Sequence, residues 1–196
     1  MKNFTIFLMF CLWYSTPSFS KPIVISHRGA SSYLPEHSLI GASLAHGMNP
    51  DFIEPDTVLT KDGIPILLHD LYLESTTNVA EVYPHKKRKD QHWYALDFTL
   101  QEIKKLKLRE RTNPKTGRPY FKDRFPNHIL LSEIPTLEEI IQLVGGLNHS
   151  RNKRIGLYIE MKGPHFHTQS GYDITKSVIE LLKKYQYLQK LLFLFY

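Results

Sequence analysis

Short apolar runs alternate along this chain with longer stretches in which apolar residues recur at helical spacing. The first run, Ile23–Ser26, is rich in β-branched residues and is expected to form a buried strand. Further strands are expected at 52–56, 64–69 and 155–160. The turn signal Lys61-Asp62-Gly63 joins the second and third of these strands, which is typical of a hairpin or a closely linked pair.

Helical spacing of apolar residues occurs in four stretches. They are 39–46, which Gly47 ends, and then 100–108, 136–144 and 174–185. The third stretch begins with Thr136 and has Glu139 three residues later, which is the pattern of a capping box. Strands that alternate with helices predict an α/β fold with a mostly parallel sheet.

Residues 71–134 differ from the rest of the chain. Charged and aromatic residues are mixed there, the segment 113–119 is rich in residues that break regular structure, and only 100–108 shows helical spacing. We interpret 71–134 as an insertion into the main fold. The chain then divides into a leader, 1–20, and one domain, 21–196, which contains this insertion.

The first twenty residues have the layout of a secretory signal peptide. Lys2 gives a positive start, 4–14 is an apolar run, and small residues follow up to Ser20, after which we expect cleavage. The run is shorter than the roughly 20 apolar residues of a membrane-spanning helix, and a retained anchoring helix is the alternative. The protein is therefore expected to cross the inner membrane to the periplasm or the cell exterior, without stable membrane insertion after cleavage. The single cysteine, Cys11, lies in the leader, so the mature domain is expected to lack disulfides and thiol chemistry.

The formal net charge of +6 raises the question of a nucleic-acid partner. The densest basic run, Lys86–Lys89, is short, and we interpret it as a solvated part of the surface. No basic stripe interleaved with aromatic residues occurs in the sequence, so no nucleic-acid surface is expected. A basic chain still attracts anionic small molecules.

Polar side chains stand at the ends of all four predicted strands. In parallel α/β folds the carboxyl ends of strands meet at one rim, where active sites are built. Glu54 and Asp56 are separated by one residue, so in an extended chain both carboxylates point to the same side. The complete set, in chain order, is His27, Arg28, Glu54, Asp56, His69, Asp70, Glu160 and Lys162.

The types of these residues fit a phosphodiester substrate. Glu54, Asp56 and Glu160 form a hard oxygen-ligand set, which suits Ca²⁺ or Mg²⁺ better than Zn²⁺. A divalent ion at this place stabilises the charge of phosphoryl oxygens. Arg28 and Lys162 are expected to bind the phosphate, the arginine with its forked set of donors.

Two histidines complete the set. His27 and His69 are expected to act as a general acid and base pair, because imidazole titrates close to neutral pH. Taken singly, each residue of the set has an ordinary structural explanation, such as a hydrogen-bonded histidine or a solvated carboxylate. Their coincidence on one rim favours catalysis. The sequence leaves open which histidine is the acid.

Several motifs resemble those of one enzyme family. They are Ser26–Ser31 and Leu34–Ser38, then Ile53–Asp56, Thr60–Gly63 and Leu67–Asp70, and finally Gly146–Ser150 and Ile159–Lys162. The first two are similar to the opening signature of the glycerophosphodiester phosphodiesterases, and the next three follow in that family's order and spacing. The last two resemble its periplasmic branch, which carries an insertion. The resemblance covers 23–189, with a departure at His165, where a large aromatic residue is expected in this branch.

The resemblance implies a TIM-type (β/α)₈ barrel. It also implies hydrolysis of small-molecule glycerophosphodiesters, such as glycerophosphocholine or glycerophosphoethanolamine, to an alcohol and glycerol 3-phosphate, with a need for Ca²⁺ or Mg²⁺. The same roles follow for the histidines, the carboxylates and the two cationic residues named above. Attack by the substrate's own glycerol hydroxyl, with a cyclic phosphate formed first, is a mechanism that the family suggests. The preferred head group and the ion used in the cell stay open.

The length departs from a complete barrel. A (β/α)₈ barrel takes about 250 residues and at least about 200, whereas removal of the leader leaves 176 of the 196 residues. With four strands and a terminal apolar run at 191–196, we expect a barrel that is incomplete at the C-terminus. Three hypotheses remain: an active metal-dependent phosphodiesterase, a secreted non-catalytic binding or surface protein, and an inactive fragment of the enzyme. The intact pair of His27 and His69 favours the first over the second, and the oligomeric state is open.

Overall fold

The computed structural model describes residues 21–126, 128–187 and 191–195. The predicted leader, 1–20, lies outside the described residues together with its Cys11, and so does Tyr196 at the end of the terminal apolar run. Within the described ranges, no helix is both long enough and apolar enough to cross a membrane.

A parallel-rich sheet is built around the strand β5 (Gly156–Met161). The strands β2 (Phe52–Glu54) and β3 (Asp56–Leu59) pair in parallel with successive parts of β5. The strand β6 (Leu191–Phe195) is also parallel to β5. Because β2, β3 and β6 pair with the same stretch of β5, β6 lies on the opposite edge of that strand. The expectation of an α/β fold with a mostly parallel sheet is confirmed, and the terminal apolar run forms one of its strands.

One predicted strand, 52–56, is divided at Pro55 into β2 and β3, and β3 continues to Leu59. Proline has no backbone N–H to give to a ladder, so the regular pairing is interrupted there. The carbonyl of Pro55 still accepts a hydrogen bond of 3.0 Å from the backbone N–H of Glu160, which holds both halves against β5. The strand β4 (Pro65–Leu67) is antiparallel to β3, which confirms the predicted hairpin, although the strand is shorter than 64–69.

The first strand, β1 (Ile25–His27), is parallel to β2 and starts later than predicted. The expectation that Ile23–Ser26 is buried was wrong: Ile23 is 62% exposed and Val24 52% exposed. The reason is position, since β1 is an edge strand that pairs only with β2 among the described residues.

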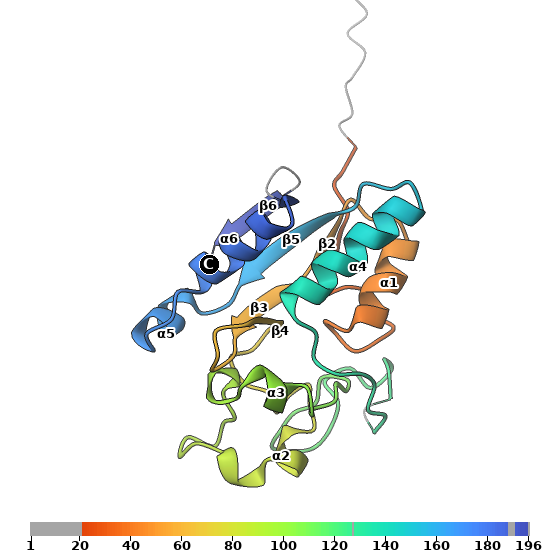
Figure 1. Ribbon diagram of the computed structural model, residues 1–196. Coiled ribbons are helices and arrows are strands. Elements are labelled where there is room, and N and C mark those ends of the chain that lie inside the picture. Colours follow the sequence, from red (N-terminus) through yellow and green to blue (C-terminus); the bar gives the residue numbers. More distant parts are fainter. Residues whose placement is uncertain (1–20, 127, 188–190, 196) are drawn as a thin grey trace, which may run out of the picture.

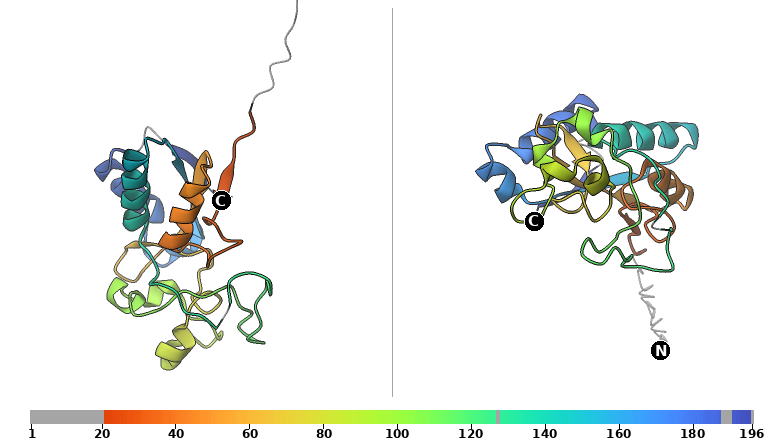
Figure 2. Two further views of the ribbon diagram at one scale, coloured as in Figure 1. Left: turned by 90° about the vertical axis from the view of Figure 1, so that its right-hand side faces the viewer. Right: turned by 90° about the horizontal axis from the view of Figure 1, so that it is seen from below.

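Three helices cover the sheet. The helices α1 (Leu39–Gly47) and α4 (Leu137–Ser150) lie side by side, and α6 (Ile174–Lys184) follows the short helix α5 (Pro164–Gln169) (Figures 1 and 2). The capping box predicted for α4 is confirmed, because Thr136 and Glu139 exchange hydrogen bonds between side chain and backbone. The helix extends six residues beyond the predicted end at 144.

The main hydrophobic core lies between the sheet and these helices. The strand residues Ile53 and Leu157 are fully buried, and Ala45, Val144 and Val178 meet them from α1, α4 and α6. This packing fixes β2 and β5 in one position, and with them the polar residues that follow at their carboxyl ends.

Residues 71–134 lie together at one end of the molecule, next to β3 and β4 (Figure 1). Their helices are short: α2 (Val79–Val82), the 3₁₀ turns Pro84–Lys86 and Ala95–Asp97, and α3 (Leu100–Ile103). They surround a second apolar cluster in which Phe98 is fully buried. That this segment is an insertion into the main domain stays a prediction.

The helix predicted at 100–108 was wrong beyond Ile103. Leu106 and Leu108 are buried in the second cluster instead. The backbone of Leu108 bonds to Leu131 and Ser132 at 2.8 Å, so an extended pairing replaces the helical hydrogen bonds. Tertiary contacts override local helical spacing here.

The basic run that was interpreted as solvated surface is exposed at most positions, but two of its side chains form ion pairs. Lys86 contacts Glu102 on α3 at 2.5 Å, and Arg88 binds both oxygens of Asp97 at 2.7 Å. These pairs hold the short elements of 71–134 to one another.

Candidate active site

Three carboxylates meet where β2, β3 and β5 run together. Glu54 ends β2, Asp56 begins β3, and Glu160 lies opposite Asp56 in the register of β5. One oxygen of each lies within 4.8 Å of the others. Glu54 and Asp56 are buried, and Glu160 is partly exposed. Glu54 and Asp56, on either side of the break at Pro55, therefore lie beside Glu160 of the neighbouring strand β5.

The charges of these carboxylates are set by their surroundings. Burial, and after it the charge of Asp56, raises the pKa of Glu54 to about 8. Burial alone also raises the pKa of Asp56, but the hydrogen bond with His37 and nearby positive charge outweigh it and hold that pKa well below its ordinary value. At neutral pH the buried pair is therefore one carboxylic acid and one carboxylate, as expected when like charges share a buried site.

The two cationic residues predicted for phosphate lie against this acidic group. The guanidinium Nε of Arg28 is 3.3 Å from Asp56, and the ammonium of Lys162 is 2.5 Å from Glu160 and 3.5 Å from Asp56. Burial lowers the pKa of Lys162, but its pairs with Glu160 and Asp56 raise it above the ordinary value overall. Both residues are thus fixed at the rim as cations, close to any anion that approaches the carboxylates.

The predicted catalytic histidines differ in their surroundings. His27 ends β1, and the residue as a whole is exposed. Partial burial of its imidazole, together with the charge of Arg28, lowers its pKa. His69 follows β4, and its Nδ1 lies 2.6 Å from Oδ1 of Asp70. Burial raises the pKa of Asp70, but hydrogen bonds from His69 and Arg111 lower it to about 2, so this carboxylate accepts protons in hydrogen bonds and cannot donate one. Nδ1 of His69 therefore carries a hydrogen, and Nε2 is left for a substrate.

The backbone before α1 is bent sharply to place Arg28. Arg28 has φ 58° and Gly29 φ 80°, a left-handed pair in which glycine is favoured. A Cβ on Gly29 would stand 3.2 Å from the carbonyl carbon of Gly41, so the turn packs tightly on α1. The bend aims the N–H of Arg28 at Oε2 of Glu54, at 2.7 Å. A non-glycine residue at positive φ beside such a site is a strained position of the kind found in active sites.

Sequence reasoning missed two buried residues of the site. His37 donates through Nε2 to Oδ2 of Asp56 at 3.0 Å. The carboxylate of Glu36 accepts hydrogen bonds from the guanidinium groups of Arg28 and Arg111. Both stand in the motif Leu34–Ser38, which resembles the family's opening signature, so their membership of that motif was the signal that could have identified them. Arg111 lies in the segment 71–134, and nothing local in the sequence sets it apart.

The carboxylate group has the chemistry of a divalent-cation site. Oε1 of Glu54 is buried and has no hydrogen-bond partner among the described residues. All three groups offer oxygen, and none of the ligand atoms is nitrogen or sulfur, which suits Ca²⁺ or Mg²⁺. The residues therefore fit the ion that the sequence predicted.

The raised pKa of Glu54 predicts a pH dependence of stability. Between its ordinary value of 4.5 and about 8, the folded chain binds a proton that the unfolded chain releases. Without a divalent ion, the free energy of unfolding should therefore fall as the pH rises through this window. Added Ca²⁺ should restore more stability at about pH 8 than at about pH 5, because the ion replaces the proton.

Urea unfolding at several pH values, in the chain and in Glu54→Gln, measures this effect. Burial also raises the pKa of Glu110 to about 6, which acts in the same direction in the lower part of the window. The quantity to compare is therefore the difference between the two proteins. Equal pH slopes in both would show that Glu54 is not the titrating group.

An α/β fold of parallel-rich type carries three acids, two histidines and two cationic residues at its strand ends, which is where proteins of TIM-barrel architecture build their active sites. Residues 27–195 match the Glycerophosphoryl diester phosphodiesterase family, and the chain belongs to that family. It is 42% identical over 173 residues to a glycerophosphodiester phosphodiesterase of Haemophilus influenzae, covering 87% of this chain and 48% of that protein. A glycerophosphodiester phosphodiesterase of Treponema pallidum is 37% identical over 170 residues, covering 86% of this chain and 48% of that protein. The chain thus spans about half the length of these curated relatives.

Solved structures support the fold. A phosphodiesterase of Oleispira antarctica, solved in complex with the product sn-glycerol-3-phosphate, is 28% identical and matches with a TM-score of 0.60, covering 89% of this chain and 56% of that one. A glycerophosphodiester phosphodiesterase of Agrobacterium tumefaciens matches with a TM-score of 0.58 at 24% identity, covering 90% and 58%. The sheet of this chain therefore corresponds to part of the TIM-type barrel of these enzymes.

Proposed function

We propose that this chain carries the catalytic half of a metal-dependent phosphodiesterase that hydrolyses glycerophosphodiesters to an alcohol and glycerol 3-phosphate. The observation that carries the proposal is the group Glu54, Asp56 and Glu160, within 4.8 Å of one another and beside Arg28 and Lys162. The product bound to the Oleispira antarctica phosphodiesterase supports the same substrate class.

Ca²⁺ or Mg²⁺ would be held by Glu54, Asp56 and Glu160. When bound, the ion supplies positive charge that polarises phosphoryl oxygens and stabilises the charge that develops on them. The buried position of Glu54 and Asp56 keeps that charge from being screened by water. Arg28 and Lys162 stand on the same rim and orient the phosphate, the arginine with the donors that its acidic partners leave free.

The two histidines move protons. One takes the proton from the attacking oxygen, which belongs to water or to the substrate's own glycerol hydroxyl, and the other gives a proton to the oxygen of the leaving alcohol. His69 has a ring held at Nδ1 by Asp70, so its Nε2 is the transferring atom. Burial and Arg28 lower the pKa of His27, which favours the neutral ring that a general base needs.

The location outside the inner membrane is part of the proposal. It rests on the positive start, the short apolar run and the small residues of 1–20, together with the motifs similar to the periplasmic branch. Fractionation of cells that express the tagged chain, with and without residues 1–20, tests it. We expect the full chain outside the inner membrane and the shortened chain in the cytoplasm.

Release of glycerol 3-phosphate from glycerophosphocholine by the purified full chain tests the activity. We expect turnover with Ca²⁺ that stops when a chelator is added and returns when Ca²⁺ is restored. The matched control is His27→Ala, which should bind Ca²⁺ and stay inactive. Binding of sn-glycerol 3-phosphate without any turnover would favour the non-catalytic hypothesis, and insoluble chain would favour the inactive fragment.

A further inference from the structure

Arg111 stands at the centre of a network of ion pairs that joins residues 71–134 to the rim of the sheet. Its Nη1 donates to Oδ2 of Asp70 at 2.6 Å. Its Nε and Nη2 donate to the two oxygens of Glu36 at 2.9 and 2.7 Å, which is a bidentate pair. The side chain is only 15% exposed, so all three contacts are shielded from water.

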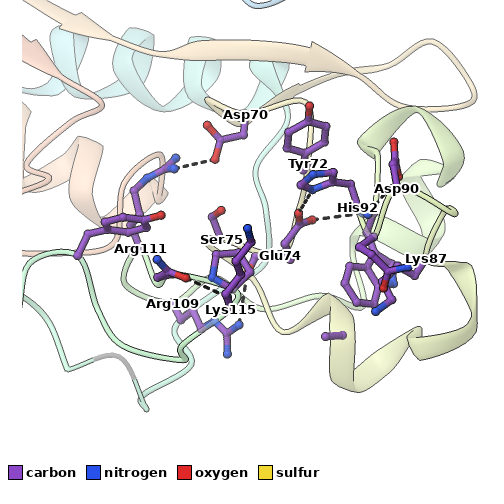
Figure 3. A pocket seen from close by; sticks show the side chains of 16 residues that line it. Asp70, Tyr72, Glu74, Ser75, Lys87, Asp90, His92, Arg109, Arg111 and Lys115 are labelled. Atoms are coloured by element: carbon purple, nitrogen blue, oxygen red, sulfur yellow. Dashed lines mark hydrogen bonds and ion pairs between the residues drawn. The ribbon is translucent and has the colours of Figure 1, made fainter.

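Each carboxylate that Arg111 holds also contacts a residue of the candidate active site. The second oxygen of Asp70 binds His69, at 2.6 Å, and Glu36 binds Nη1 of Arg28 through both oxygens, at 3.3 Å. The ion pairs therefore run without a gap from one catalytic group to one phosphate-binding group. Figure 3 shows the pair of Arg111 and Asp70 at the edge of a cavity of about 920 Å³ that Arg111 helps to line.

We propose that Arg111 is a positioning residue that fixes His69 and Arg28 relative to each other through Asp70 and Glu36. The role rests on the proposed function, because it concerns the orientation of two groups that act on the phosphodiester. It also gives residues 71–134 a part in the reaction that their sequence does not indicate.

The arm through Asp70 controls the ring of His69. Asp70 accepts hydrogen bonds from His69 and from Arg111 on different oxygens. When Arg111 is absent, the carboxylate is free to rotate and to turn its charge toward other partners. The ring then loses the fixed acceptor that selects its tautomer, and Nε2 is less often in the state that the reaction needs.

The arm through Glu36 controls Arg28. Glu36 is 7% exposed and has both cationic partners on the same two oxygens. Burial raises its pKa, but the hydrogen bonds and charge of Arg111, with His37 and Arg28, lower it overall, so the group is a carboxylate. Without Arg111, Arg28 is left as the arginine that neutralises the buried carboxylate of Glu36. The attraction to Glu36 then pulls the Arg28 guanidinium away from a bound phosphate. We therefore expect the Asp70 arm to affect kcat and the Glu36 arm to affect KM.

Kinetics of Arg111→Gln and Arg111→Lys test the proposal. The first should lower kcat about 10–100-fold, the usual range for a lost orienting partner. Lysine restores the charge without the fork, so Arg111→Lys should fall between Arg111→Gln and the original chain. The double variant with Asp70→Asn should have a kcat no lower than that of the worse single variant, because both changes break the arm through Asp70. Arg109→Gln is the matched control, since Arg109 donates to the carbonyl of Glu74 and to neither network acid.

A readout without turnover separates this proposal from the proposed function. In ¹⁵N-histidine NMR spectra, with His69 assigned by His69→Gln, the original chain should show the tautomer with hydrogen on Nδ1. Arg111→Gln should show a mixture of tautomers and weaker binding of sn-glycerol 3-phosphate, even if no glycerophosphodiester is hydrolysed. An unchanged His69 signal, unchanged affinity and unchanged kcat in a less stable Arg111→Gln would overturn the proposal, because Arg111 would then only tether 71–134.

Discussion

Replacement of His69 by alanine should lower kcat for glycerophosphodiester hydrolysis by about 10²–10⁴-fold, the usual contribution of a positioned acid or base. The residue follows β4, and Asp70 holds its Nδ1 so that Nε2 faces away from the carboxylate. Alanine removes the group that transfers the proton and leaves the three carboxylates in place. The affinity for Ca²⁺, measured by calorimetry, should therefore be unchanged.

The exposed histidine of α5 gives a matched control for this result. His165→Ala removes an imidazole from the same chain at an exposed position, and it should leave kcat at its original value. The same comparison tests the departure from the family pattern at His165. A full loss of activity in His165→Ala, or near-normal kcat in His69→Ala, would move the proton transfer to another residue.

Replacement of Asp56 by asparagine should weaken Ca²⁺ binding by at least about 100-fold, because even a partner outside the ligand set changes metal affinity by about 10–100-fold. The side chain is fully buried and lies between Glu54 and Glu160. The amide removes the negative charge that Asp56 carries, because the pKa of this carboxyl is held well below its ordinary value. Arg28 and Lys162 then lie beside a site with less negative charge and repel the ion more strongly.

Asp56→Asn also weakens the hydrogen bond to His37, which should lower stability by about 1–3 kcal/mol. Glu160→Gln is a second variant that should weaken Ca²⁺ binding with less effect on folding, since its side chain is 22% exposed. Asp123→Asn, at an exposed position, is the control for a lost negative charge. Original Ca²⁺ affinity in a folded Asp56→Asn or Glu160→Gln would exclude this group as the metal site.

Much of the fold and part of the site followed from local patterns. The hairpin of β3 and β4 was predicted from the turn signal at 61–63, and the start of α4 from the capping box of Thr136 and Glu139. Both depend on residues within a few positions of each other, so the sequence carries them directly. The strand Ile23–Ser26 and the helix 100–108 failed for the opposite reason, because neighbours far along the chain decided exposure in one case and backbone pairing in the other.

The group of three carboxylates shows which contacts can be predicted from sequence spacing and which cannot. Glu54 and Asp56 share a side because they are two residues apart in an extended chain, and the register of β3 with β5 brings Glu160 opposite Asp56. The relation between Glu54 and Asp56 is local in sequence. The relation between Asp56 and Glu160 could be predicted only from the rule that the carboxyl ends of parallel strands meet at one rim. His37 lies in the motif Leu34–Ser38, but its contact with Asp56 joins residues 19 positions apart, and the motif does not indicate that contact.

The sequence by itself determined the alternation of strands and helices, the family and the residue types that stand at the strand ends, whereas the order of the strands in the sheet came from the structure. Only the tertiary structure decided which charges meet: Arg111 binds Glu36 across 75 positions and Asp70 across 41. No periodicity links such residues, because their contact is set by how 71–134 packs against the sheet. The local pattern specifies elements, and the packing of distant elements specifies the network that orients His69 and Arg28.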